Sequence, residues 1–253
     1  MTGRLHAPSH SAAVAGHGPL GIAVTLAFGL VLTTAFSWFL SILIELVGMH
    51  TLWKDKGLLH ARDLVQEDLQ YIADAPHSLL VADTVGFSRD LIARVAMPFE
   101  RLDIVGFHER TRVALERPAT RGGRPGSSTL ERISSTLARM WSTLGMVALY
   151  TAQDTALRLA IVVFALPAFV LACLLGAVDG MVRRDLRKWG GGRESSFVYH
   201  HAKAMTYLAL GGGFSLYLAW PGGGFNPSYM VLAGTALVAW SLSLTLSSFK
   251  KYL

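Results

Sequence analysis

"TALRLAIVVFALPAFVLACLLGAV", residues 155 to 178, decides the class of this protein because it is an apolar run with one charge, Arg158. A membrane-spanning helix needs about 20 predominantly apolar residues, so this run is long enough to cross a bilayer. The whole chain is 52% hydrophobic and 16% charged, whereas soluble domains carry about 25% charged residues. The sequence therefore predicts an integral membrane protein.

Three further apolar segments predict additional spans. Residues 20–47 carry one charge, Glu45, and form an uncleaved signal anchor, since they exceed a signal-peptide core and no cleavage pattern follows. We predict an all-α integral membrane protein with four transmembrane helices. They lie at residues 20–47, within 141–178, at 204–220 and at 228–249, and the second continues from an interfacial helix.

Between the first two spans, residues 48–140 carry 13 Lys or Arg and 12 Asp or Glu. Helical periodicity of apolar residues predicts a helix from Leu58 to about Ile72, stopped by Pro76. A second helix is expected around residues 88–96 and to end before Pro98, and a third at 109–117. This inserted region is expected to be mostly helical and to need support from the membrane or a partner, because its own core is thin.

A stretch rich in Gly, Pro and Arg, residues 117–128, is typical of a flexible linker. Ser128 to Glu131 then form a capping-box sequence, which predicts the start of a helix that runs into the second span. Pro167 is expected to kink this helix within the span.

Charged residues at the edges of the spans allow two interpretations. Asp154 and Arg158 are four residues apart, so they share a helix face and can form an ion pair at the membrane boundary. Glu45 most simply lies at the far membrane interface. The functional alternative is an intramembrane carboxylate or a proton or ion relay.

The distribution of positive charge predicts the orientation. Residues 179–203, a basic elbow between two spans, carry six Lys or Arg and three acids, and the turn at 221–227 carries no charge. Positive loops stay in the cytoplasm. Residues 1–19, an expected disordered tail, and residues 250–253 are therefore cytoplasmic, and the inserted region 48–140 is extracytoplasmic.

We expect the basic elbow to contact lipid headgroups or a partner. In it, Asp179 and Arg183 are expected to pair, and the glycine triplet ends the helix. The candidate contact residues are Arg183, Arg184, Arg187, Lys188, Gly190, Gly191, Gly192, Arg193, Glu194, Tyr199 and His200.

Several kinds of site lack their sequence signature. The only cysteine, Cys173, allows neither an internal disulfide nor a cysteine-based metal site. The phosphate-loop, H-E-x-x-H and G-x-S-x-G patterns do not occur. We therefore predict no catalytic, cofactor-binding or metal-binding residues and no enzyme. Direct contact with nucleic acid is not expected, because membrane topology accounts for the basic residues.

"VDGMVRRDLRKWGGGRESSFVYHHAK", residues 178 to 203, closely resembles the signature of a family of membrane proteins encoded by bacterial integrating conjugative elements. The resemblance extends over most of the chain. It implies a bacterial inner-membrane protein that is accessory to conjugative DNA transfer through type IV secretion machinery. It carries over no catalytic residues.

The resemblance also implies partners. These are membrane lipids and other membrane proteins of the conjugation apparatus, with the coupling ATPase as one candidate, and homo-oligomerisation stays open. Two other functions remain as alternatives. One is a small transporter or channel that uses Glu45, Asp154, Arg158 and Gly211 to Gly213. The other is a membrane enzyme acting on lipid or cell-wall substrates, for which residues such as His200 and His201 would be tested.

Overall fold

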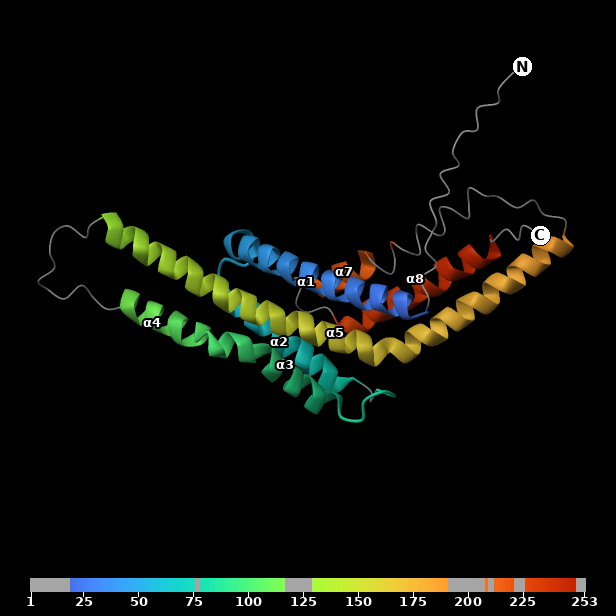
Figure 1. Cartoon of the computed structure of the whole chain (residues 1–253), viewed down its shortest axis with the longest axis horizontal. Coiled ribbons are helices and arrows are strands. Elements are labelled where there is room, and N and C mark those ends of the chain that lie inside the picture. The colour runs from blue at the N-terminus through green and yellow to red at the C-terminus, as the bar shows by residue number, and fades with distance from the viewer. Residues whose placement is uncertain are drawn as a thin grey trace, which may run out of the picture.

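The computed structural model describes residues 19–75, 78–116, 129–190, 208, 212–220 and 226–248. Every regular element in these ranges is a helix, which confirms the all-α prediction (Figure 1). The helices are α1 (Pro19–Thr51), α2 (Leu58–Asp74), α3 (Thr84–Arg101), α4 (Ile104–Glu116), α5 (Thr129–Trp189), α7 (Gly213–Leu218) and α8 (Pro227–Ser247).

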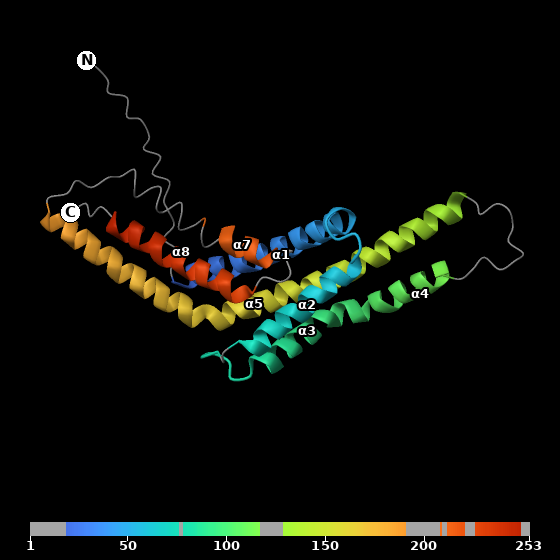
Figure 2. The ribbon, with the colours of Figure 1, turned by 180° about the vertical axis from the view of Figure 1, so that it is seen from behind.

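The molecule is organised around α5, a single helix of 61 residues. At 1.5 Å per residue such a helix is about 90 Å long. Each of the other helices contacts it. It changes direction partway along its length, and Pro167 lies within the helix, as expected for a proline kink (Figures 1 and 2). Helices α1 and α7 lie along one edge of α5, and α3 and α4 lie along the other.

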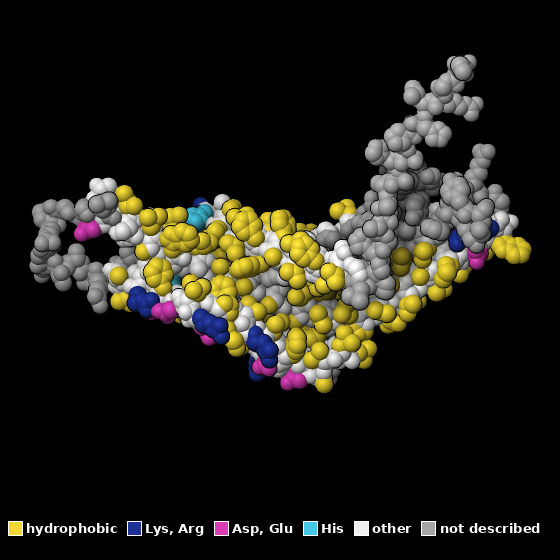
Figure 3. Space-filling model, viewed as in Figure 1, with side chains coloured by type: hydrophobic (Ala, Val, Ile, Leu, Met, Phe, Trp, Pro, Cys, Tyr) yellow, Lys and Arg dark blue, Asp and Glu magenta, His cyan; other side chains and the backbone are white. Residues whose placement is uncertain are grey.

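Three helices are long and apolar enough to cross a membrane, at Ala27–Thr51, Glu131–Trp189 and Pro227–Ser247. Their surfaces carry exposed apolar side chains such as Phe28 and Val31, which are 64% and 65% exposed. Figure 3 shows these side chains covering α1 and the second half of α5, while charged side chains gather along the edge of α3 and α4. This distribution is consistent with a membrane protein. Of the span predicted at 204–220, the structure describes residue 208 and residues 212–220, where α7 is six residues long, so a fourth spanning helix stays a prediction.

The inserted region contains the three predicted helices, but two of them differ from the expected bounds. Helix α2 agrees with its prediction, and α5 begins at Thr129, where the capping box predicts a start. Helices α3 and α4 begin at Thr84 and Ile104, earlier than the expected starts near residues 88 and 109. The prediction that the second helix ends before Pro98 is wrong, because α3 continues to Arg101. A proline so close to the end costs few backbone hydrogen bonds, and packing of α3 against α5 offsets that loss. The predicted linker at 117–128 and the segments 1–18, 221–225 and 249–253 lie outside the described residues.

The apolar stripe of α2 packs against α5. Val65 and Ile72 form a buried cluster with Leu157 of α5, which is fully buried. Further side chains from α2, α3 and α5 pack against this cluster, and they are Leu69, Val85, Ile92, Ile161 and Phe164. The support that the inserted region needs for its thin core is therefore provided by α5 of the same chain.

Helix α8 runs parallel to the second half of α5. A Cβ atom on Gly176 would collide with the backbone carbonyl of Ala239, and one on Gly180 would lie 2.7 Å from the carbonyl oxygen of Ser243. Farther along, Arg187 Nη1 donates a hydrogen bond to the carbonyl of Ser247 (3.2 Å). Small residues allow two helix backbones to approach this closely.

Replacing Gly176 by Leu should therefore force α5 and α8 apart. Overpacking of this kind costs about 1–3 kcal/mol, which should lower the thermal denaturation midpoint of the detergent-purified protein. Gly29→Leu in α1 is the matched control, because a Cβ there would meet nothing within 4 Å. Equal midpoints for the two variants would contradict the close α5–α8 packing.

Candidate functional site

Arg158 is a charged residue that α5 places in the protein interior. It is only 4% exposed. Its Nε lies 3.2 Å from Asp154 Oδ2, one helical turn earlier, and 3.1 Å from Asp68 Oδ2 on α2. The predicted Asp154–Arg158 pair is therefore confirmed, and the guanidinium is shared with a second carboxylate from a distant part of the sequence.

The same guanidinium also binds the end of α7. Arg158 Nη1 donates to the backbone carbonyls of Tyr217 (3.2 Å) and Trp220. The last carbonyls of a helix have no partner within the helix, and a cation near that end is electrostatically favourable. Arg158 thus connects α2, α5 and α7 through one side chain.

A second buried pair connects α1 to α2. His60 Nδ1 lies 3.1 and 3.2 Å from the two carboxylate oxygens of Glu45, which is 2% exposed. An ionised carboxylate only accepts hydrogen bonds, so Nδ1 is the donor when Glu45 is ionised. The His60 ring stacks on Trp53, with ring centroids 4.1 Å apart and planes at 13°. Glu45 therefore lies inside the protein, and its expected position at the level of the membrane interface stays a prediction.

We call Glu45, His60, Asp68, Asp154 and Arg158 the buried ionic cluster. Removing a charge from water is expensive, and pairing with an opposite charge partly offsets the cost. Burial raises the pKa of Asp68 above its usual value, and the neighbouring Arg158 opposes that shift. The cluster is thus held by mutual neutralisation in a site with little solvent.

The sequence patterns did not identify two members of the cluster as site residues, and these are His60 and Asp68. Asp68 had a signal, because it lies three residues after Val65 and four before Ile72, on the apolar face of α2. A charged residue on a buried face requires a partner. That the partner of Asp68 is Arg158 on α5 can be seen only in the folded structure. His60 has no comparable signal.

The basic elbow is described only as far as Gly190. The predicted Asp179–Arg183 pair is confirmed, with 2.8 Å between Oδ2 and Nε. Arg183 and Lys188 are exposed, while Arg184 and Arg187 are partly buried. Gly190 follows the end of α5 in a turn, and its N–H donates to the carbonyl of Leu186 (3.0 Å). The other predicted contact residues lie outside the described part of the chain, and they are Gly191, Gly192, Arg193, Glu194, Tyr199 and His200.

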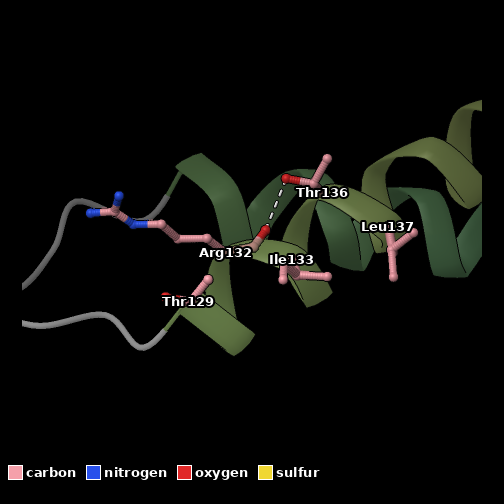
Figure 4. A pocket seen from close by; sticks show the side chains of 5 residues that line it. All are labelled: Thr129, Arg132, Ile133, Thr136 and Leu137. Atoms are coloured by element: carbon pink, nitrogen blue, oxygen red, sulfur yellow. Dashed lines mark hydrogen bonds between the residues drawn. The ribbon is translucent and has the colours of Figure 1, made fainter.

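The described surface has two hollows. The first lies on the opening turns of α5, where Thr129, Ile133 and Leu137 follow one side of the helix and Arg132 extends away (Figure 4). It is a shallow surface depression. The second is an apolar groove of about 390 Å³ between α2, α5 and α8, with Phe164, Pro167 and Val231 among its lining residues. In the described ranges, no group of three or more His, Cys, Asp or Glu is arranged to hold a metal ion.

Arg158→Leu should destabilise the protein strongly. Removing one partner of a buried ion pair costs about 3–5 kcal/mol, because the remaining charges stay buried without compensation. Denaturation of the detergent-purified protein should show this loss. Arg183→Leu removes a pair with the same spacing on the same helix, but its side chain is 55% exposed, so little change is expected. Equal effects of the two substitutions would argue against the buried ionic cluster.

Comparison with known proteins identifies the family. No curated protein and no solved structure matches the chain. The family model described as "IncC plasmid conjugative DNA transfer protein DtrJ-like" matches residues 52–250, from the residue after α1 to just beyond α8. This match covers most of the chain and confirms the link to conjugation that the elbow sequence implied. The chain belongs to the DtrJ-like family of conjugative DNA transfer proteins.

Proposed function

We propose that this protein is a non-enzymatic scaffold or accessory subunit of a conjugative DNA-transfer apparatus, embedded in the bacterial inner membrane. The observation that carries the proposal is the family match over residues 52–250 combined with three helices able to span a membrane. A type IV secretion-like apparatus is the machinery that the elbow sequence implies. That the parent element integrates into a chromosome stays a prediction from the same resemblance.

The parallel arrangement of α5 and α8 supports four spans. Both helices run in the same direction, with Gly180 beside Ser243 and Arg187 beside the carbonyl of Ser247. Their C-terminal ends are therefore on the same side of a bilayer that both cross. The chain between them has to return to the opposite side, and the apolar residues 204–220 are suited to that crossing.

The charge at these two ends supports their cytoplasmic placement. Arg183, Arg184, Arg187 and Lys188 lie in the last two turns of α5. Lys250 and Lys251 follow α8 in the sequence. Cytoplasmic ends of spans carry an excess of Lys and Arg, so both ends face the cytoplasm and the region of α2 to α4 faces outward.

Reporter fusions test this topology. Fusions after Trp189 and after Ser248 should both behave as cytoplasmic, and a fusion after Asp83, between α2 and α3, should behave as extracytoplasmic. Placing Trp189 and Ser248 on opposite sides would exclude the parallel crossing of α5 and α8. Placing all three on one side would exclude the four-span topology.

The exposed basic end of α5 is the proposed contact surface with the apparatus or with anionic lipid. Arg183 and Lys188 are both exposed, whereas Arg187 donates a hydrogen bond to the carbonyl of Ser247 on α8. Lys and Arg near an anionic leaflet are attracted to it. The neighbouring Trp189 is 91% exposed, which fits an aromatic anchor at the membrane interface.

Conjugation assays with a deleted and complemented parent element test the proposed function. Deletion should abolish or strongly reduce transfer. Combined Arg183→Ala and Lys188→Ala substitutions should reduce transfer at unchanged membrane abundance, because they remove two exposed charges, which contribute little to stability. Arg89→Ala with Arg94→Ala, two exposed residues of α3, is the matched charge control.

Normal transfer after deletion would refute a role in conjugation. Equal transfer by the two double variants would refute a specific role for the elbow. Arg193→Ala with Glu194→Ala extends the test to the second half of the elbow and should also reduce transfer. Crosslinking of the complemented protein would then identify its neighbours.

A further inference from the structure

The buried ionic cluster contains more negative than positive groups. Its acids are Glu45, Asp68 and Asp154, and its permanent cation is Arg158. If His60 is counted as charged and assigned to Glu45, Arg158 still faces two carboxylates. One negative charge is then in excess, inside a site whose members are almost fully buried. An uncompensated buried charge is too costly to persist, and a carboxyl group in this position becomes neutral by binding a proton.

Hydrogen bonding in the cluster is also incomplete. Among the described residues, Asp154 Oδ1, Thr155 Oγ1 and Tyr217 Oη are buried polar atoms with no hydrogen-bond partner. Asp154 uses only its other oxygen, Oδ2, on Arg158. Buried polar groups in proteins are almost always hydrogen-bonded, so Asp154 Oδ1, which no other group uses, is the atom on which a bound proton is most simply placed.

Four helices present groups that can influence this proton. Arg158 lies on the same helix, Asp68 on α2, Glu45 on α1 and the Tyr217 hydroxyl on α7. Asp68 and Asp154 each have one oxygen within 3.2 Å of the same guanidinium nitrogen, so their carboxyl groups are neighbours. Two adjacent carboxyls that share one cation are suited to sharing one proton.

We propose that the buried ionic cluster is a proton-binding site, in which the carboxyl pair of Asp68 and Asp154 holds one exchangeable proton. With the proton bound, Arg158 neutralises the remaining carboxylate and keeps its hydrogen bonds to the carbonyls of α7. After the proton leaves to water, one excess negative charge remains beside Arg158. The attachment of α2 and α7 to α5 then weakens.

Infrared spectroscopy of the purified full-length protein tests the site directly. At neutral pH the wild type should show the carbonyl band of a protonated carboxyl. Asp154→Asn and Asp68→Asn should each remove it, because a single remaining carboxylate pairs with Arg158. Asp179→Asn, on the same helix and in a pair of the same spacing, should keep the band, and so should Glu45→Gln.

Absence of the band in the wild type would overturn the proposal. So would its loss in Glu45→Gln together with its persistence in Asp154→Asn, since the proton would then lie on the pair with His60.

The pH dependence of stability gives a second test. It needs only the wild-type protein, so it can be made even if a variant fails to fold. Above about pH 4 an unfolded Asp is ionised, so the native state then binds one more proton than the unfolded chain and its stability should fall as the pH rises. The denaturation midpoint should fall over the pH range in which the infrared band is still present, and it should level off once the band is lost. A midpoint that stays constant or rises with pH while the band is present would contradict the proposal. Stabilisation at neutral pH by sodium or potassium over choline would show a bound metal ion instead. These measurements do not depend on conjugative transfer.

Discussion

The requirement that Arg158 be neutralised inside the protein determines how the first half of α5 is surrounded. Its partners are Asp154 on the same helix, Asp68 on α2 and the carbonyls at the end of α7. Asp68 and these carbonyls are distant from Arg158 in sequence, and they cannot separate from it without leaving buried groups unpaired. The Glu45–His60 pair extends the connection to α1. One charged centre thereby holds the anchor helix, the inserted region and the returning chain against α5.

The two halves of α5 use different physical means of association. Around the first half, charge pairs combine with the apolar cluster of Val65, Ile72 and Leu157. Along the second half, α8 packs through glycine contacts at Gly176 and Gly180, with apolar side chains on the outside. In the hydrocarbon of a bilayer the hydrophobic effect contributes little to helix association. Close packing of the two backbones therefore stabilises the contact between α5 and α8. The basic end of α5 is then presented by a parallel pair of helices.

Much of this fold could be predicted from hydropathy and local spacing. The apolar runs predicted the three spanning helices, the capping box at Ser128 to Glu131 predicted the start of α5, and spacing predicted the Asp154–Arg158 pair. The sharing of Arg158 with Asp68 and the carbonyls of α7 could not be predicted, because it depends on how helices far apart in sequence pack. The burial of Glu45 against His60 could not be predicted for the same reason, because His60 lies beyond the end of α1.

Hydrogen–deuterium exchange on Arg158→Leu in lipid nanodiscs tests the central claim most directly. Loss of the guanidinium should increase exchange in α2 and α7 while leaving α8 as protected as in the wild type, since α8 packs on the other half of α5. Unchanged exchange in α2 and α7, in a variant that stays folded, would contradict the account that Arg158 holds these helices in place.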